Sequence, residues 1–350
     1  MSYTNGLDKP SDYFNTVIYT GTGATQSITV GFQPDLVWGK SRSGSGYHHN
    51  LVDSVRGNTK YLESDRANAE NTLTDAVTSF TSDGFTLGAD AGDREFNENN
   101  NSMVAWNWLA GNGTASNSNG SITSTVSANT TAGFSIVSYT GNGTDNATVG
   151  HGLSVTPSFA LVKNRDDSDH WGVWHQSFSA HTSYNSLSQN IATINSDDIF
   201  KAFSSTLFTL GTDSWSNTNT EKYVAYLFAE KKGFSKFGSY TGNGNADGTF
   251  IYTGFKPAFV MVKNTSATQN WLLYNNKISS FNAITALNFP NLSSAEDPSA
   301  GARMDMLSNG FKLRINNAGE NGSGNNYIYM AFAAEPLVAN VGSSIPATAR

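Results

Sequence analysis

The sequence predicts an all-β protein that consists of three tandem antiparallel β-sandwich repeats, of jelly-roll or lectin-like type, with about 100 residues in each. One phrase occurs three times: an apolar run ends in Tyr-Thr-Gly-x-Gly, an alternating segment follows, and a second apolar run begins just after a proline. The prolines are Pro34, Pro157 and Pro257, which lie 123 and 100 residues apart. Because this step is the length of a small domain, the repeat predicts the architecture.

The composition supports the same fold class. Among the 350 residues, 14% are charged and 12% are aromatic, and there are 33 glycines, which is typical of a β-rich protein with many turns. The net charge of -7 argues against a nucleic-acid partner, which would need a basic face. The sequence has no cysteine, so disulfides and thiolate metal sites are excluded and apolar burial must supply the stability.

The first repeat, residues 13–111, shows the signals of each expected element in order. A proline at the start of a strand removes no needed hydrogen bond, which favours a strand after Pro34, and Asp83-Gly84 is a strong hairpin signal. Trp106 and Trp108 are two residues apart in the last strand and should share one face. Residues 67–77 are compatible with one short helix, although their apolar spacing is thin. Strands or strand pairs are expected at 14–19, 27–32, 35–40, 48–57, 79–88 and 102–111.

The same blocks recur in the same order at residues 133–231 and 232–335, the second and third repeats. Residues 112–132, NGTASNSNGSITSTVSANTTA, have almost no large apolar side chains. Such a stretch buries too little surface to offset its ordering entropy, so it is expected to be a Ser/Thr/Asn-rich linker. Residues 1–12 and 336–350 are expected to form an N-terminal and a C-terminal arm.

Tryptophans are the candidate ligand-binding residues. Trp171 and Trp174 in HWGVWHQSF, and Trp271 in NWLLYNNKI, can stack on sugar rings if their faces are exposed. The alternative is that these side chains face the sandwich core, where aromatic residues are usually buried. Trp171 and Trp174 are an odd number of residues apart, so a regular strand turns them to opposite faces and at least one is expected to point outward.

No catalytic or metal site is expected. His170 and His175 point to opposite faces of a regular strand and cannot share a metal ion. The acidic stretches 88–100 and 164–170 contain oxygen ligands suited to calcium, but neither fits the spacing of an EF-hand loop, and solvated turns are the commoner use of such residues. The sequence has no Gly-x-Ser-x-Gly elbow, and nothing singles out a carboxylate pair for glycoside hydrolysis.

The blocks HHNLVDSVRG, TSFTSDGFTLG and MVAWNWLAG resemble a domain of unknown function that recurs in structural proteins of tailed bacteriophages of marine bacteria. The resemblance covers residues 13–111 well, whereas the second and third repeats lack the counterparts of Asp53 and Arg56. It implies a structural role in the virion, in a tail, a fibre or the head surface. The family brings no established catalytic residues, so none is assigned and no enzyme activity is expected.

We therefore expect a non-enzymatic virion structural protein, fibre-like or of adhesin type, that contacts host-surface glycans and forms homo-oligomers. One alternative is a capsid decoration or attachment protein that binds only other virion proteins. A polysaccharide depolymerase is a further alternative, weakened by the lack of a catalytic constellation. No cofactor is expected. Membrane insertion is not expected either, since no secretory signal precedes residue 15 and no apolar run approaches the roughly 20 residues that span a bilayer. The expected location is the virion, after assembly in the cytoplasm of the bacterial host.

Overall fold

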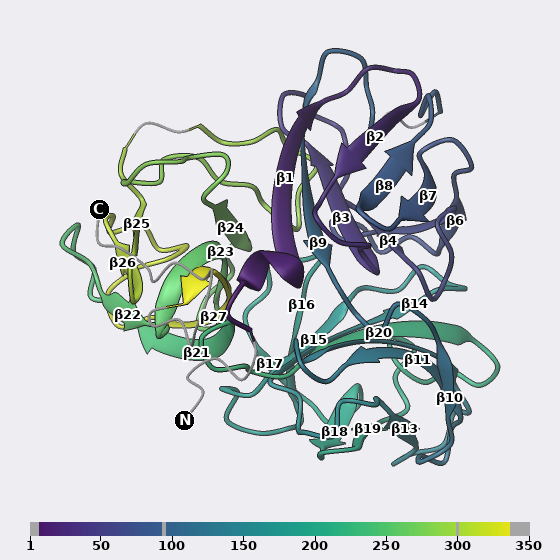
Figure 1. The fold of residues 1–350 in the computed structure, drawn as a ribbon. Helices are drawn as coiled ribbons and strands as arrows, with labels where there is room; N and C mark the ends of the chain where they lie inside the picture. The colour runs from purple at the N-terminus through teal and green to yellow at the C-terminus, as the bar shows by residue number, and fades with distance from the viewer. Residues whose placement is uncertain (1–6, 93–95, 299–300, 337–350) are drawn as a thin grey trace.

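The computed structural model describes residues 7–92, 96–298 and 301–336, and these residues form antiparallel sheets, none of which closes on itself. The one helix in this part of the chain is the short 3-10 helix η1 (Pro10–Asp12). The all-β class predicted from the sequence is confirmed. The chain falls into segment 1 (7–111), segment 2 (112–231) and segment 3 (232–336), which lie side by side around a common centre (Figure 1).

Segment 1 contains a six-stranded sheet of order β1-β9-β3-β4-β5-β6 and a three-stranded sheet of order β2-β8-β7. Its strands are β1 (Phe14–Thr20), β2 (Gln26–Thr29), β3 (Leu36–Ser41), β4 (Asn50–Asp53), β5 (Lys60–Glu63), β6 (Asn71–Thr72), β7 (Val77–Thr81), β8 (Gly84–Leu87) and β9 (Ser102–Trp108). The Asp83-Gly84 signal lies at the expected β7–β8 hairpin.

Segment 2 contains an eight-stranded sheet of order β10-β11-β12-β20-β14-β15-β16-β17 and a three-stranded sheet of order β13-β19-β18. Its strands are β10 (Ala115–Asn117), β11 (Ser124–Asn129), β12 (Phe134–Thr140), β13 (Thr148–Gly150), β14 (Phe159–Asn164), β15 (Gly172–His175), β16 (Ser183–Ser186), β17 (Ile194–Asn195), β18 (Phe200–Phe203), β19 (Leu207–Leu210) and β20 (Lys222–Phe228).

Segment 3 contains a four-stranded sheet of order β21-β27-β23-β24 and a three-stranded sheet of order β22-β26-β25. Its strands are β21 (Ser235–Thr241), β22 (Phe250–Tyr252), β23 (Phe255–Asn264), β24 (Leu272–Asn275), β25 (Met304–Leu307), β26 (Gly310–Leu313) and β27 (Asn326–Pro336). The central strand order of the larger sheet is thus the same in each segment: β1-β9-β3-β4, β12-β20-β14-β15 and β21-β27-β23-β24.

Each larger sheet is buried on both faces. In β27, Ile328, Met330 and Phe332 face the centre of the molecule, whereas Tyr327 and Tyr329 face the small sheet of segment 3. The same alternation holds in β9 and β20, because successive strand residues point to opposite faces. The sharing of one face by Trp106 and Trp108, expected from their spacing, is confirmed.

The inner faces of the three larger sheets form one central core. Aromatic rings join the segments directly, with ring centroids 4.9 Å apart between Phe14 and Phe332, 6.2 Å between Trp108 and Phe228, and 5.7 Å between Trp108 and Phe332. The outer faces form three separate cores, one beneath each small sheet. Each segment therefore buries one apolar face of its larger sheet against the other two segments.

The expected linker at 112–132 is wrong. This stretch contains β10 and β11, and β11 pairs along the whole edge of β12. Its few apolar side chains, Ile122 and Val126, are buried, and the backbone hydrogen bonds of a pre-existing sheet edge supply the rest of the ordering energy. Amino-acid composition does not predict such a strand, because composition reflects only side chains and not the backbone hydrogen bonds that the strand forms with a neighbouring sheet edge.

The short helix suggested for 67–77 is also wrong, since β6 pairs with β5 there and no helix forms. In the expected N-terminal arm, Leu7 is fully buried in the central core and Pro10 is buried at the start of η1, so residues 7–12 belong to the folded body. The expected C-terminal arm lies outside the described residues, except for Pro336 at the end of β27.

The turn after β12 should be sensitive to any side chain at Gly141. A Cβ atom there would lie 2.3 Å from the backbone oxygen of Thr218. We expect Gly141→Ala to lower the free energy of unfolding by about 1–3 kcal/mol, measured by urea denaturation. Gly92→Ala is the control, since a Cβ there would meet only Leu73 Cδ1 at 3.7 Å. Equal midpoints for the two variants would contradict the close approach.

The shared core predicts that a single segment does not fold alone. A fragment of residues 112–231 would expose the inner face of its sheet, including Trp171, Tyr226 and Phe228. We expect this fragment to bind a hydrophobic dye and to lack a cooperative thermal transition, while the full chain unfolds in one transition. Circular dichroism and calorimetry test this, and a cooperative melt of the fragment would show that the segment is independently stable.

Candidate binding site at the segment seams

The tryptophans proposed from the sequence are all buried. Trp171 and Trp271 are 0% and 1% exposed and lie in the central core, and Trp174 is 3% exposed and lies in the outer core of segment 2. The opposite orientation of Trp171 and Trp174 is as expected, but the outward placement is wrong because both faces of the sheet are covered. None of these rings can stack on a ligand at the surface of the folded chain.

Two of these rings instead connect segments. The indole N–H of Trp171 donates to the backbone oxygen of Glu63 at 2.7 Å, and that of Trp271 donates to the backbone oxygen of Ser186 at 2.7 Å. The donors belong to segments 2 and 3 and the acceptors to segments 1 and 2, so the same contact occurs at two successive boundaries. A buried tryptophan usually finds such a partner for its one donor.

The segments meet at three seams that close into a ring. Each seam contains one equivalent backbone hydrogen bond. In the first seam, between segments 1 and 2, Glu70 N donates to Arg165 O at 2.8 Å. In the second seam, between segments 2 and 3, Thr193 N donates to Thr265 O at 3.1 Å. In the third seam, between segments 3 and 1, Glu296 N donates to Arg42 O at 3.0 Å.

Two of the three seams are closed by a bidentate ion pair. In the first, Arg165 Nε and Nη2 each lie 2.9 Å from an oxygen of Glu70. In the third, Arg42 Nε and Nη2 lie 2.7 and 3.2 Å from the oxygens of Glu296. A paired planar geometry of this kind is the strong form of a carboxylate–guanidinium contact.

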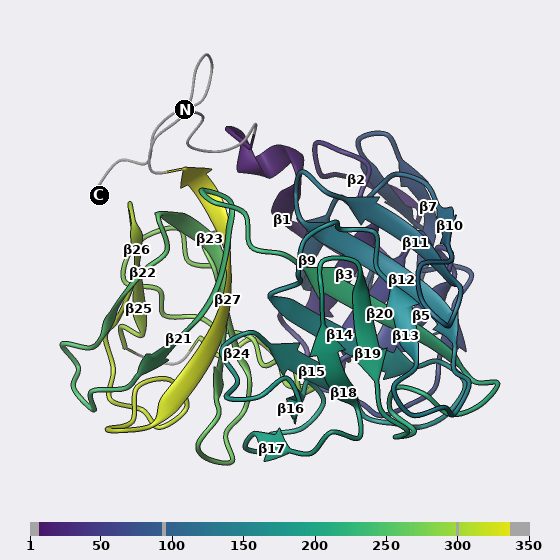
Figure 2. The ribbon, with the colours of Figure 1, turned by 90° about the horizontal axis from the view of Figure 1, so that it is seen from below.

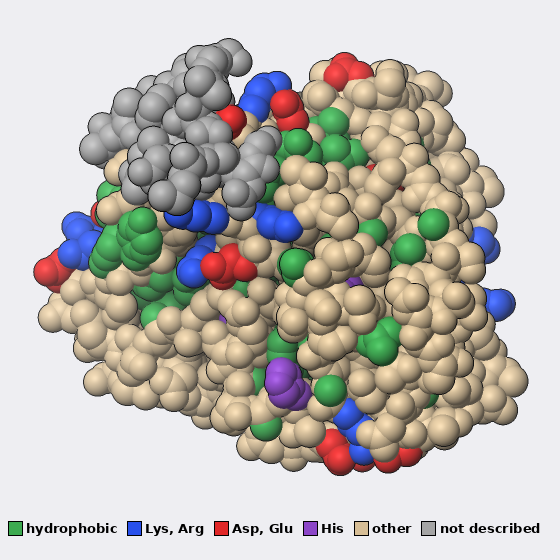
Figure 3. Space-filling view, turned by 60° about the horizontal axis from the view of Figure 1, so that its bottom comes forward, with side chains coloured by type: hydrophobic (Ala, Val, Ile, Leu, Met, Phe, Trp, Pro, Cys, Tyr) green, Lys and Arg blue, Asp and Glu red, His purple; other side chains and the backbone are tan. Residues whose placement is uncertain are grey.

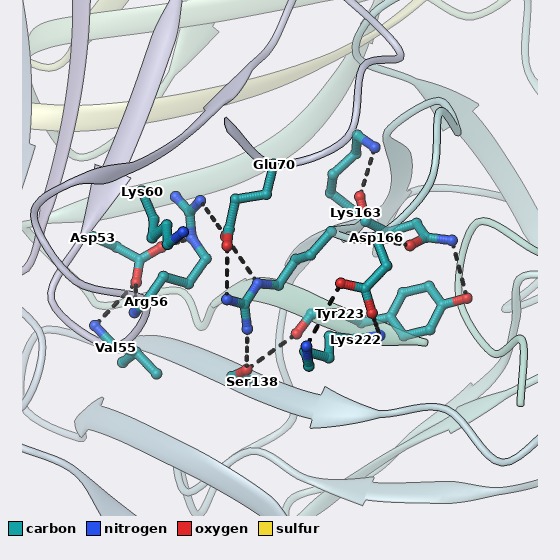
Figure 4. A network of polar contacts seen from close by, with 12 residues as sticks. Asp53, Val55, Arg56, Lys60, Glu70, Ser138, Lys163, Asp166, Lys222 and Tyr223 are labelled. Carbon is teal, nitrogen blue, oxygen red and sulfur yellow. Dashed lines mark hydrogen bonds and ion pairs between the residues drawn. The ribbon is translucent and has the colours of Figure 1, made fainter. Parts of the chain in front are cut away.

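The first seam also contains a fully buried arginine, and Figure 4 shows how its partners converge. Arg56 Nη1 lies 3.0 Å from Glu70 Oε2, and Arg56 Nη2 donates to the Tyr226 hydroxyl at 3.1 Å. Arg56 also pairs with Asp53, which in addition accepts a hydrogen bond from the Tyr226 hydroxyl at 2.7 Å. A buried charge is tolerated when it is paired and hydrogen-bonded on all sides, so this network joins segments 1 and 2.

The environment of the seam shifts the pKa values of its groups. Burial alone would raise the pKa of Glu70, but the hydrogen bond from Arg165 and the charges of Arg56 and Arg165 hold it below the ordinary value. Burial would likewise lower the pKa of Arg56, yet Asp53 and its other partners raise it. Both groups are therefore charged at neutral pH, and the network is electrostatically complete.

Among the described residues, the second seam has no such bidentate ion pair and contains a cavity instead. Thr265 stands where the other seams have an arginine, and Thr193 stands where they have a glutamate. The cavity at this place measures about 600 Å³. Its lining is mostly hydroxyl and amide side chains, with Phe178 beside them and with no lysine, arginine, histidine or carboxylate; it includes Ser177, Asn195, Ser239, Thr241, Thr265 and Asn326. We call this cavity the second-seam pocket.

A lysine is buried at the same position of each segment. Lys40, Lys163 and Lys263 have no exposed surface, and their ammonium groups bind backbone oxygens. Lys40 and Lys263 reach across a seam to the oxygens of Ser293 and Asn190. Burial lowers the pKa of Lys163 to about 8 and that of Lys263 to about 7. Because the position and its carbonyl partners recur, these shifts reflect a structural role that holds the strand ends together.

Within residues 7–92, 96–298 and 301–336, no group of three or more His, Asp or Glu side chains could hold a metal ion. The described acidic turns are occupied by their own backbone: Asp90 accepts hydrogen bonds from Phe96 N and Asn97 N, and Asn164 accepts from Asp166 N and Asp167 N. In the same residues no helix is long and apolar enough to cross a membrane.

Sequence reasoning missed the second-seam pocket, although the repeat contains its signal. After each buried lysine the sequence reads Lys-Ser-Arg at 40–42, Lys-Asn-Arg at 163–165 and Lys-Asn-Thr at 263–265. The exchange of arginine for threonine in the third copy marks the seam where the described residues have no bidentate arginine–glutamate pair. The partner glutamates lie in loops outside the repeated blocks, so only the structure identifies them.

The candidate site is thus the second-seam pocket, in an all-β protein whose three segments share one central core. Residues 9–336 match a protein family described as a domain of unknown function, DUF7483, and the chain belongs to this family. A single family match spans all three segments, in agreement with their common core. No curated protein and no solved structure matches the chain.

The first seam predicts a pH-dependent effect of Glu70→Gln. Since the folded pKa of Glu70 is lowered, its ionised form stabilises the fold above the ordinary pKa, and this stabilisation is lost as the pH falls through the folded value. We expect the variant to lose roughly 1.5–3 kcal/mol of unfolding free energy at neutral pH, as for hydrogen bonds to charged groups. The loss should shrink toward pH of about 3.

Urea denaturation across this pH range measures the effect, with Glu296→Gln as the matched control. Glu296 forms ion pairs with Arg42 alone among the described residues, whereas Glu70 contacts both Arg56 and Arg165. The control should therefore show the smaller loss at neutral pH. A loss for Glu70→Gln that does not change with pH would mean that its charge is unimportant.

Proposed function

We propose that this chain is a non-enzymatic structural protein of a bacteriophage virion, of adhesin type, and that the second-seam pocket binds a neutral glycan of the host surface. In this proposal the three segments are tandem β-sandwich repeats that form one rigid body and carry one specialised seam. The observation that carries the glycan assignment is the pocket itself, where two threonines replace the ion pair that closes the other two seams.

The chemistry of the pocket suits a sugar. Hydroxyl and amide groups such as Ser239, Thr265 and Asn326 both donate and accept hydrogen bonds, as a sugar hydroxyl requires. Phe178 supplies an aromatic ring at the edge of the cavity, on which the apolar face of a sugar can pack. The lining has no formal charge, which favours an uncharged ligand over a phosphate or a metal ion.

The surface around the body is consistent with a weak polar binder. Figure 3 shows a face dominated by uncharged polar side chains and backbone, with Lys, Arg, Asp and Glu in small separate groups. The ionisable groups with strongly shifted pKa values include Arg56 and Lys263, and these are enclosed by structural partners. This supports a binding role rather than catalysis.

A second candidate is a decoration or attachment protein that binds only other virion proteins. It is favoured by aromatic side chains that remain exposed on segment 3: Phe250 and Tyr252 on β22 are 43% and 58% exposed, and Phe281 is 77% exposed. Aromatic residues are enriched in protein interfaces. In this case the second-seam pocket would have no ligand.

The test fills the pocket with the ion pair that the other seams possess. We expect Thr193→Glu with Thr265→Arg to remain folded and to weaken binding to immobilised bacterial surface polysaccharides by about tenfold or more, equivalent to about 1.4 kcal/mol. The control is Thr114→Arg with Thr123→Glu, which makes the same changes at exposed positions far from the pocket. Surface plasmon resonance measures the binding.

Two outcomes would overturn the glycan assignment. The first is an equal loss of polysaccharide affinity in the pocket variant and the control variant. This result would show that the added charges, and not the filled pocket, weaken binding. The second is a wild-type chain that binds none of the polysaccharides but sediments with purified virions, which would favour the decoration protein.

A further inference from the structure

The outer edge of the larger sheet is treated differently in the three segments. In segment 2, the edge of β12 is paired with β11, and Ile136 and Ser138 lie opposite Ser127 and Thr125. The same stretch also reaches the small sheet, because Ile122 bridges Val149 of β13. Residues 115–129 thus fill the groove between the two sheet edges of segment 2.

The corresponding groove of segment 1 is open. It lies between β1 and β2, has a volume of about 470 Å³, and is lined by residues 15–20 and 26–29 together with Lys277 of segment 3. Ile18 in this groove is 45% exposed, although it is a large apolar residue in a strand. An open strand edge of this kind is a template for pairing with another strand.

The backbone of β1 is oriented to accept such a strand. Leu109 N donates to Tyr13 O at 2.9 Å and Gly21 N donates to Asn101 O at 2.8 Å, so the odd-numbered residues of β1 are hydrogen-bonded to β9. Thr16 and Ile18 therefore direct their N–H and C=O groups away from β9. No described residue forms a hydrogen bond with these four groups.

In segment 3, side chains form hydrogen bonds with the backbone at the outer edge of β21. Phe237 N donates to the Glu230 carboxylate at 3.3 Å, and Gln176 Nε2 donates to Phe237 O at 2.6 Å. Thr249 Oγ1 donates to Thr241 O at 3.1 Å, and Gln26 Nε2 donates in the same way to Thr20 O at 3.3 Å in segment 1. Segment 2 covers its edge with a strand, and segment 3 caps the middle of its edge at Phe237 with side chains. Among the described residues, only the edge of segment 1 has neither a covering strand nor a cap at this position.

The chain order indicates which residues complete segment 1. The stretch that covers segment 2 directly follows β9, the last strand of segment 1. In the ring of segments, the equivalent stretch for segment 1 follows β27, the last strand of segment 3. Figure 2 shows that β27 ends beside η1, which also contacts the start of β1. The described part of the chain therefore ends close to the start of β1, at one end of the open groove.

The sequence of that stretch resembles the covering strand of segment 2. Residues 121–126 read Ser-Ile-Thr-Ser-Thr-Val, and residues 344–349 read Ser-Ile-Pro-Ala-Thr-Ala. Ile122 is the residue that bridges to β13 and is buried against it. Its counterpart is Ile345, so the apolar anchor of the covering strand is present in both stretches.

We propose that residues 337–350, which lie outside the described residues, occupy the groove between β1 and β2 of the same chain in the way that residues 115–129 occupy the groove of segment 2. In this arrangement Ala349 lies opposite Val17, as Val126 lies opposite Val137. Ile345 packs on Ile28, the counterpart of Val149, since the two pair with Phe85 and Phe208 at equal positions. The chain thereby closes its ring of segments.

A disulfide placed across the proposed pair tests this, since the chain has no cysteine of its own. We expect Val17→Cys with Ala349→Cys to form an intramolecular disulfide on mild oxidation, because Val17 occupies a narrow pair position where Cβ atoms are about 4.5–5.5 Å apart. Val126→Cys with Val137→Cys is the positive control in segment 2. Mass spectrometry and non-reducing electrophoresis detect the bond.

Val17→Cys with Val338→Cys is the matched negative control. Val338 corresponds to Ala115 on β10, which is two strands from β12 and so roughly 10 Å from the pair position. Equal oxidation of this pair and of the test pair would overturn the proposed register. Disulfide-linked dimers would show that the stretch binds a second copy, and a test pair that stays reduced while the positive control oxidises would show that the stretch does not cover β1.

Hydrogen exchange on chains without cysteine gives an independent result. We expect the amides of Thr16 and Ile18 to exchange about tenfold or more slowly in the full chain than in a chain that ends at Pro336. Equal exchange in the two chains would overturn the proposal. The amides of Ile136 and Ser138, covered by β11 in both chains, serve as the internal reference.

Discussion

The structure depends on the mutual burial of three apolar sheet faces that nothing else covers. Each larger sheet has a second apolar face, but its own small sheet occupies that side. Complete burial of a large apolar side chain contributes about 1.5–3 kcal/mol, and a hydrogen bond to a charged seam group contributes a similar amount, roughly 1.5–3 kcal/mol. The central core contains many more buried apolar side chains than the seams have ion pairs. The central core, with Phe14, Trp108, Phe228 and Phe332 in contact, therefore dominates the association of the segments.

The polar seams have a different task, which is to fix how the segments fit together. Apolar burial is not directional, so it does not by itself determine the rotation of one segment against another. Hydrogen bonds such as the one from Trp171 to Glu63 O, and the network around Arg56, are satisfied in a single arrangement. The residues that form these polar contacts can be replaced one pair at a time, because the central core supplies most of the stability. The replacement of an ion pair by Thr193 and Thr265 is one such change.

The sequence predicts the fold class because its strongest signals are local. The Asp83-Gly84 hairpin and the shared face of Trp106 and Trp108 follow from chain geometry over a few residues. The burial of Trp171 does not follow, since strand alternation specifies opposite faces but not whether each face is covered. Residues 112–132 fail for a related reason, because their order depends on the edge of β12 and not on their own composition. The candidate pocket is visible only by comparison of Arg42, Arg165 and Thr265 within the repeat.

The equivalent edge strands β1, β12 and β21 differ in what covers their outer edges. This difference follows from how the chain connects the three segments. In a ring of three identical sheets every edge would need the same cover, and the chain would have to supply three covering strands. A short connection, such as the residues between β20 and β21, leaves no room for one, so Glu230 and Gln176 cap that edge instead. A long connection, such as the one between β9 and β12, can supply two strands. The edge of β1 lies where the first and last strands of the described residues come together, so its cover cannot come from a connection between segments.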